Sequence, residues 1–251
     1  MPIIATKSEN FSENPDEKKE IISCIIPFYN EEKRISSVLK AISQIKGISE
    51  IICIDDGSTD NTSALVENTF SKIRLIKLGK NKGKSAAIEN GLTFVKTRYV
   101  FLIDSDLNNL NIEKIEKAIN AVKTEDSIDM FIFKIITTPT WLLFLVKFFR
   151  GDVIASGHRI LKTADLRQVF SSRKPKNYQL EVAINEYMME NKKKCFWLEG
   201  IGTNPHKSEK TNLKGWIDDL TVILLLFGYL GVFNWLKQYF LFCKKGYEKQ
   251  I

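Results

Sequence analysis

Several common sequence signatures are missing from this 251-residue chain. It has four cysteines, and none of them forms a Cys-x-x-Cys pair. Cys24 and Cys53 lie within apolar stretches, so we expect buried thiols in a reducing compartment rather than a disulfide framework. No positively charged start followed by an apolar stretch is visible at the N-terminus, so we expect no secretory signal. Basic residues interleaved with stacking aromatics are also missing, which argues against nucleic acid as a partner.

The composition is that of a globular protein, with 44% hydrophobic and 27% charged residues. The length allows one substantial α/β domain, or one domain with an appendage. Lysine and arginine number 37 against 30 acidic residues, which gives a net charge of +7. A basic protein with apolar patches fits an anionic membrane surface as a partner.

Apolar runs and amphipathic stretches alternate along the first half of the chain. The runs that predict buried strands are 21–28, 50–55, 73–78 and 99–103. Helical patterns follow the first three runs, and the first helix should bury Ile35, Val38, Leu39 and Ile42. Repeated strand–helix units predict right-handed crossovers and a parallel sheet. Further on, we expect helices near 112–122 and 179–191, a strand at 128–135, and a helical pattern that the stretch 156–159 precedes.

The fourth apolar run leads into two carboxylates, Asp104 and Asp106, one residue apart. In open α/β sheets the ligand lies beyond the carboxyl ends of the strands, where this pair falls. Two carboxylates this close repel each other unless a cation lies between them, and Mg²⁺ or Mn²⁺ bridging to phosphate resolves that repulsion. The alternative is a strand end with two solvated aspartates.

Polar clusters follow the other three runs as well, at 29–31, 55–58 and 81–84. Carboxylates in them can accept hydrogen bonds from a base or ribose, and a lysine can meet phosphate. Four such clusters in order predict a site for a nucleotide diphosphate bound through a metal.

These clusters resemble the ordered signatures of family-2 glycosyltransferases. The matching segments are Pro-Phe-Tyr-Asn-Glu-Glu at 27–32, Asp-Asp-Gly-Ser-Thr-Asp at 55–60, Asn-Lys-Gly-Lys-Ser-Ala at 81–86 and Asp-Ser-Asp at 104–106. The resemblance implies a GT-A fold, with a mostly parallel central sheet flanked by helices, and a metal-dependent inverting transfer from a nucleotide-sugar. It further implies that the donor is bound by Pro27, Tyr29, Glu31, Asp56, Lys84, Asp104 and Ser105, and that Asp104 and the catalytic Asp106 hold Mg²⁺ or Mn²⁺.

Later segments resemble the polyprenyl-phosphate branch of that family. Asn108 stands where the branch usually has a glutamine as third metal ligand, and is one methylene shorter. Ser-Gly-His-Arg at 156–159 is similar to the branch's Ser-Gly-Phe-Arg, whose arginine meets the acceptor phosphate, which makes Arg159 a catalytic and acceptor-binding candidate. The loop at 205–210 matches a basic loop of the branch, with Lys207 and Lys210 as further acceptor-binding candidates.

The C-terminal region carries an apolar run at 220–242, which as one helix would reach about 35 Å. It fits a membrane-spanning helix or two interfacial helices, and a buried helix of a soluble domain is the alternative. The apolar stretch at 141–149 is too short to span and reads as a core helix or an interfacial segment. We therefore divide the chain into a flexible tail (1–20), a GT-A catalytic domain (21–215) and a C-terminal membrane-associated segment (216–251).

Three functions remain open from the sequence. The first is transfer to a polyprenyl or dolichyl phosphate by a membrane-associated enzyme whose catalytic domain faces the cytoplasm. The second is transfer to a saccharide hydroxyl, which requires a general base. Glu181 is the candidate base, although a carboxylate there also suits a first helical turn. The third is a catalytically silent nucleotide-sugar-binding or scaffold protein, against which the intact Asp-x-Asp argues.

Overall fold

The computed structural model describes residues 22–134, 151–176, 179–203 and, near the C-terminus, 231, 233, 234 and 236–238. The strands are β1 Ile22–Phe28, β2 Ile48–Asp55, β3 Arg74–Lys77, β4 Tyr99–Leu102, β5 Met130–Phe133, β6 Arg159–Lys162 and β7 Cys195–Leu198. The helices are α1 Ile35–Ile42, α2 Thr62–Thr69, α3 Lys84–Leu92, α4 Ile112–Thr124, α6 Gly151–Ile154, α7 Thr163–Arg173 and α8 Leu180–Glu190.

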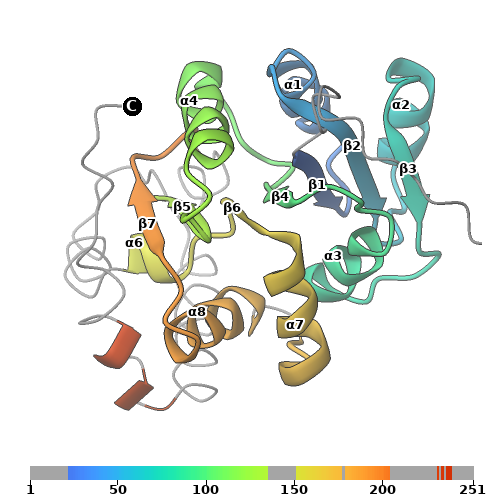
Figure 1. The fold of residues 1–251 in the computed structure, drawn as a ribbon. Coiled ribbons are helices and arrows are strands. Elements are labelled where there is room, and N and C mark those ends of the chain that lie inside the picture. Colours follow the sequence, from blue (N-terminus) through green and yellow to red (C-terminus); the bar gives the residue numbers. More distant parts are fainter. Residues whose placement is uncertain are drawn as a thin grey trace, which may run out of the picture.

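The strands form one seven-stranded sheet in the order β3-β2-β1-β4-β6-β5-β7 (Figure 1). The first four strands of that order run parallel, as the repeated strand–helix units predict. Strand β6 is antiparallel to both of its neighbours, β4 and β5, whereas β7 is again parallel to β5. The carboxyl ends of β3, β2, β1 and β4 therefore lie at one edge of the sheet.

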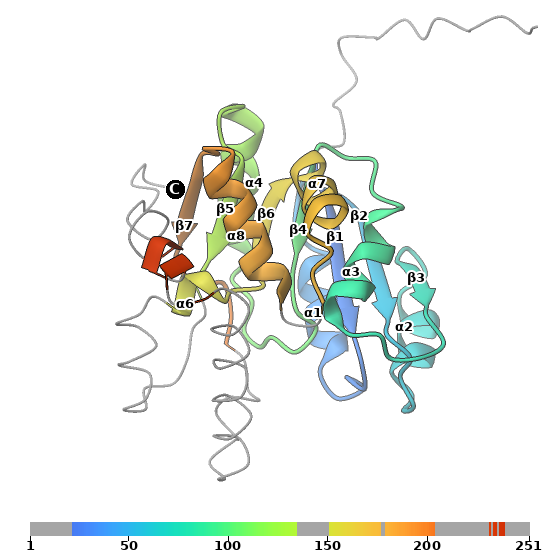
Figure 2. The same cartoon turned by 90° about the horizontal axis from the view of Figure 1, so that it is seen from below.

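Helices cover both faces of the sheet, as Figures 1 and 2 show. α1, α2 and α4 lie on one face, and α3, α7 and α8 on the other. The central strands contribute side chains to the cores on both faces of the sheet. In β4, Val100 and Leu102 pack with α3 and α8, whereas Tyr99 and Phe101 pack with α1 and α4. This two-sided burial explains the continuous apolar run of β4, since a strand covered on both faces has no solvent side.

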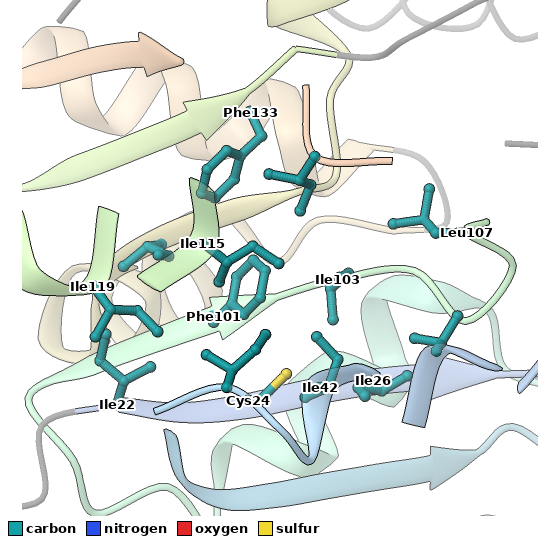
Figure 3. Close-up of a cluster of buried hydrophobic side chains, with 14 of the residues drawn as sticks. Ile22, Cys24, Ile26, Ile42, Phe101, Ile103, Leu107, Ile115, Ile119 and Phe133 are labelled. Carbon is teal, nitrogen blue, oxygen red and sulfur yellow. The ribbon is translucent and has the colours of Figure 1, made fainter. Parts of the chain in front are cut away.

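Figure 3 shows the core on the α1 and α4 side of the sheet. Phe101 of β4 and Phe133 of β5 meet there edge to face, with ring centroids 5.9 Å apart. α1 buries the four apolar positions that its periodicity predicts, Ile35, Val38, Leu39 and Ile42. Cys24 and Cys53 are buried and unpaired, as expected.

Two strands were not expected from the sequence. The helix that we expected after Ser156–Arg159 is present as α7, which begins at Thr163, but the unexpected strand β6, Arg159–Lys162, comes before it. Strand β7 was not expected either. In β6 only Ile160 and Leu161 are apolar and they stand between Arg159 and Lys162, which is too little pattern to distinguish a strand.

Several predicted segments lie outside the described residues. They are the N-terminal tail at 1–20, the apolar stretch at 141–149, the basic loop at 205–210 and most of the run at 220–242. Across the described part of the chain, no helix is both long enough and apolar enough to cross a membrane.

Candidate active site

The four polar clusters meet at one edge of the sheet, as predicted. They follow β1 (29–31), β2 (55–58), β3 (81–84) and β4 (104–106), and the parallel pairing sets these strands in the order β3-β2-β1-β4. This edge is where open α/β sheets bind their ligands.

Hydrogen bonds join the loop after β1 to the loop after β2. The amide of Asn30 donates to Ser58 Oγ at 3.0 Å, and the amide of Thr59 donates back to Asn30 Oδ1 at 2.8 Å. Asn30 has a φ of 55°, a left-handed conformation that asparagine tolerates better than most residues. The amide of Glu31 also donates to Thr62 Oγ1, at the start of α2, at 2.9 Å. The two loops thus form one rigid rim.

The buried Asp56 shapes the loop after β3. Its Oδ1 accepts from the amide of Lys82 and its Oδ2 from the amide of Gly83, both at 2.8 Å. At Gly57, φ is +79°, and a Cβ there would lie 2.6 Å from the carbonyl carbon of Lys80. A glycine is required because the two loops approach so closely. Asp56 therefore organises the wall of the predicted nucleoside pocket.

Pro27 and Tyr29 differ in their access to this pocket. Pro27 lies within β1 and is buried, whereas Tyr29 stands just beyond the strand and is 43% exposed. Of the two, Tyr29 is the side chain that the structure presents to a ligand.

Lys84, Asp104 and Glu181 form an ion cluster, which we call the Lys84 cluster. Lys84 Nζ lies 2.6 Å from Asp104 Oδ1 and 3.0 Å from Glu181 Oε1. Burial opposes the charge of Asp104, but the Lys84 ammonium and His158 hold the pKa of its carboxyl far below the usual range. Burial likewise disfavours the charged form of Lys84, but Asp104 and Glu181 raise its pKa above the usual value. Lys84 and Asp104 are therefore both charged near neutral pH.

The segment before β6 closes over this cluster. His158 Nε2 lies 3.3 Å from Asp104 Oδ2. At Gly157, a Cβ would collide with Lys84 Nζ and would lie 3.2 Å from Glu181 Oε1. A side chain at 157 would therefore have to displace the Lys84 ammonium. We predicted no role for these two residues, because nothing local in the sequence shows that 157 and 158 return to the Asp-x-Asp edge.

Arg159, our candidate for catalysis and acceptor binding, lies in the core behind the site. Its side chain is fully buried, and its guanidinium donates to four oxygen acceptors. They are the main-chain oxygens of Ser156, Ile154 and Glu181, at 2.6, 3.0 and 3.2 Å, and Asn185 Oδ1, at 2.6 Å. Contact with an acceptor phosphate would require breaking these bonds, so the arrangement favours a supporting role behind the site.

The remaining candidates lie after β4 or outside the described residues. Ser105 is buried, and Asp106 and Asn108 are partly exposed. The main chain of Asn108 pairs with Thr203, by bonds of 2.8 and 2.9 Å, which ties the Asp-x-Asp loop to the segment after β7. The two lysines of the predicted acceptor loop, at 207 and 210, are not among the described residues.

The donor set at the Asp-x-Asp fits a divalent cation. Among the described residues, no three His, Cys, Asp or Glu side chains are arranged as a metal cage. However, Mg²⁺ and Mn²⁺ favour oxygen ligands, and Mg²⁺ is commonly held by one or two carboxylates together with water and substrate phosphates. Asp104 and Asp106 supply such carboxylates, and in the Lys84 cluster the ammonium of Lys84 contacts two carboxylates, those of Asp104 and Glu181.

Comparison with known sequences gives two kinds of match. The family described as Glycosyl transferase family 2 matches residues 23–169. An uncharacterized protein of Methanocaldococcus jannaschii is 31% identical over 169 residues, which cover 58% of this chain and 73% of that protein.

Two further relatives are dolichyl-phosphate beta-glucosyltransferases. The Saccharomyces cerevisiae protein is 32% identical over 47% of this chain and 40% of its own length. The Dictyostelium discoideum protein is 37% identical over 34% of this chain and 30% of its own length. The matches thus span less than half of either enzyme.

Among solved structures, the chain is similar to glucosyl-3-phosphoglycerate synthase from Mycobacterium tuberculosis, crystallised with Mn²⁺, uridine diphosphate and phosphoglyceric acid. The TM-score is 0.64, and the match covers 84% of this chain and 78% of that one. The sequence identity is 20%, so this likeness concerns the fold alone.

Proposed function

The chain belongs to glycosyl transferase family 2, and on this premise we propose that it transfers a sugar from a nucleotide-sugar to a polyprenyl phosphate at a membrane. It is an enzyme of the nucleotide-sugar-dependent glycosyltransferase class, with a mixed α/β fold that resembles GT-A structures. One observation carries the proposal: Lys84 and Asp104 meet at 2.6 Å on the sheet edge where the polar loops of β1, β2 and β3 also converge.

The donor would lie along that edge. Tyr29, Glu31 and Asp56 belong to the rim that the β1 and β2 loops form, and they are our candidates for the nucleoside, together with Pro27 beneath them. Lys84, at the start of α3, and Ser105, between the two aspartates, are our candidates for the diphosphate. An ammonium group and a helix N-terminus both stabilise the negative charge that grows on a leaving diphosphate.

Asp104 and Asp106, with Asn108 as a further oxygen donor, would hold Mg²⁺ or Mn²⁺. When bound, the ion would neutralise charge on the diphosphate and so assist its departure. Asp104 Oδ1 already contacts Lys84, so we expect Lys84 to turn from Asp104 towards phosphate when donor and ion bind.

The acceptor assignment rests on the two dolichyl-phosphate relatives and on charge. A phosphate acceptor is already anionic near neutral pH, so it attacks the anomeric carbon in line without help from a base. Lys207 and Lys210 are our candidates for holding that phosphate. In this assignment Arg159 is a positioning residue, since its guanidinium is bound within the protein.

A hydroxyl acceptor is the second candidate, and the position of Glu181 favours it. Its carboxylate lies in the Lys84 cluster, 3.0 Å from Lys84 Nζ, where a general base would be needed. Transfer to a saccharide hydroxyl would then proceed with Glu181 taking the proton of the nucleophile.

Membrane attachment, with the catalytic domain on the cytoplasmic side, is part of the same proposal. The apolar run at 220–242 supports it, together with the net charge of +7. Flotation of the purified chain with vesicles of anionic lipid tests this, with a truncation that ends before Leu220 as the comparison. If the full chain is monodisperse without detergent and does not float, the attachment is wrong.

A donor and acceptor screen tests the reaction. The full chain, purified in detergent, is incubated with Mg²⁺ or Mn²⁺, labelled UDP- or GDP-sugars, and a short polyprenyl phosphate. The matched control is the polyprenol without its phosphate. We expect label in the lipid fraction with the polyprenyl phosphate and none with the polyprenol. Equal transfer to the polyprenol, or transfer only to saccharides, would overturn the assignment of a phosphate acceptor.

A further inference from the structure

Among the described residues near the C-terminus, Gln238 lies in the core behind the active site. Gln238 is fully buried, and its Oε1 accepts a hydrogen bond of 3.0 Å from Nδ2 of Asn185 in α8. In the same segment, Phe233 is 83% exposed and Leu236 is 40% exposed. This inverts the usual pattern of a surface segment, since the amide points inward and large apolar side chains point outward.

Asn185 binds both Gln238 and Arg159 through its side-chain amide. Nδ2 of Asn185 donates to Gln238 and also to the main-chain oxygen of Ile154, at 3.0 Å. Oδ1 of Asn185 accepts from Arg159 Nη1 at 2.6 Å. Both amide hydrogens and the oxygen of Asn185 are therefore engaged, which fixes the orientation of its side chain. All three side chains of this relay are fully buried.

Arg159 connects the relay to the active site. The same Nη1 that binds Asn185 also donates to the main-chain oxygen of Glu181, at 3.2 Å, in the first turn of α8. The Glu181 side chain in turn holds Lys84 at 3.0 Å. Hydrogen bonds therefore link Gln238 to Glu181 through Asn185 and Arg159, and the side chain of Glu181 continues the connection to Lys84, which we assign to the diphosphate.

We propose that Gln238 is a positioning residue: by seating the C-terminal segment on Asn185, it holds Arg159 and the first turn of α8 so that Glu181 keeps Lys84 in place. The proposal rests on the proposed function for the role of Lys84. It makes the C-terminal segment part of the support of the active site, in addition to any role in attachment. Removing the acceptor at 238 leaves an amide hydrogen of Asn185 without a partner in a buried setting, and such a loss is costly.

The test uses Gln238→Met, which keeps the length of the side chain but removes the acceptor. We expect kcat to fall about tenfold, a loss comparable to one buried hydrogen bond, with the donor KM changed less than about twofold. Gln238→Glu, which keeps an acceptor oxygen, should recover part of the loss. The matched control is Asn234→Ala, because Asn234 lies on the same segment and contacts the same helix, at Glu186 Oε1, but at the surface.

A double-mutant cycle shows whether the effect passes through Asn185. In an Asn185→Ala background, Gln238→Met should cause no further loss, since the relay is already broken. Additive losses would overturn the relay. Unchanged kcat in Gln238→Met, or an equal loss in Asn234→Ala, would overturn the role of Gln238.

Hydrogen exchange provides a readout that needs no substrate and so separates this inference from the proposed function. Gln238→Met should speed amide exchange in α8, where the first turn loses support, and Asn234→Ala should not. Faster exchange with no transferase activity in the wild type would contradict only the proposed function. Unchanged exchange in a folded Gln238→Met would overturn the inference.

Discussion

Gly157 lies against the ammonium group of Lys84, so closely that a single methyl group at residue 157 would collide with Nζ. The two residues are 73 positions apart and come from opposite halves of the fold: Lys84 opens α3, and Gly157 precedes β6. The approach is possible because β6 pairs with β4 and so returns the chain to the Asp-x-Asp edge. The size of residue 157 therefore determines how much space the Lys84 ammonium group has.

The first prediction concerns Gly157→Ala. The methyl group should push Lys84 away from Asp104 and Glu181, and we expect kcat to fall at least tenfold, a loss of about 1.4 kcal/mol in transition-state stabilisation. The control is Gly79→Ala, where an added Cβ meets nothing within 4 Å and only the φ of +72° causes strain. Gly79→Ala should lower the melting temperature yet keep kcat. Similar kinetics in the two variants would contradict the crowding argument.

The second prediction concerns Asp106→Ala. We expect transfer to fall by more than about a hundredfold while the circular dichroism spectrum and melting temperature stay close to wild type, because the lost carboxylate acts on metal and diphosphate. Asp126→Ala serves as the comparison, since it removes a carboxylate exposed at the surface. Turnover of Asp106→Ala within about tenfold of wild type would count against a role in metal binding.

The third prediction is the pH dependence of the Lys84–Asp104 pair, measured by urea unfolding in EDTA. The pKa of Asp104 is lowered in the folded protein, so its contribution to stability is complete above the unfolded pKa of about 4 and is lost as the pH falls below it. The pKa of Lys84 is raised, so its contribution is complete below about pH 10 and is lost above it.

We therefore expect Asp104→Asn to lower the free energy of unfolding by about 1–2 kcal/mol between about pH 5 and 9, with the difference shrinking towards pH 3. Asp126→Asn removes the exposed ion pair with Arg98 and should cost less than about 1 kcal/mol. A difference between Asp104→Asn and wild type that stays constant down to pH 3 would mean that the pair does not stabilise the fold.

The first half of the fold could be predicted because its signals are local. Apolar runs of five to eight residues gave β1, β2 and β4, and a 3.6-residue period gave the buried face of α1. The polar loops after these strands needed only the rule that parallel strands share an edge. Asp56, Lys84 and Asp104 were placed correctly on that edge for this reason.

The second half depends on contacts between distant residues. Glu181 reaches Lys84 across 97 positions, and no pattern near either residue indicates the pair. The sequence around Arg159 does not indicate whether its side chain faces solvent or the core. Its burial depends on hydrogen-bond acceptors in α6 and α8. Strand β6 has only two apolar residues between Arg159 and Lys162, too little pattern for a prediction, yet it brings 156–159 to the site.

The last prediction decides between the two acceptors, through Glu181→Gln. Glutamine keeps an oxygen that can accept from Lys84, so the Lys84 cluster survives while the base is lost. With a phosphate acceptor no proton has to be removed, and we expect kcat within about threefold of wild type. With a hydroxyl acceptor the same change should cost about 10²–10⁴ in rate. Glu181→Ala is the companion variant: it removes the contact with Lys84 as well, so it should impair either reaction. A large loss in Glu181→Gln with the polyprenyl phosphate substrate would show that Glu181 does more than hold Lys84, and would favour the hydroxyl acceptor.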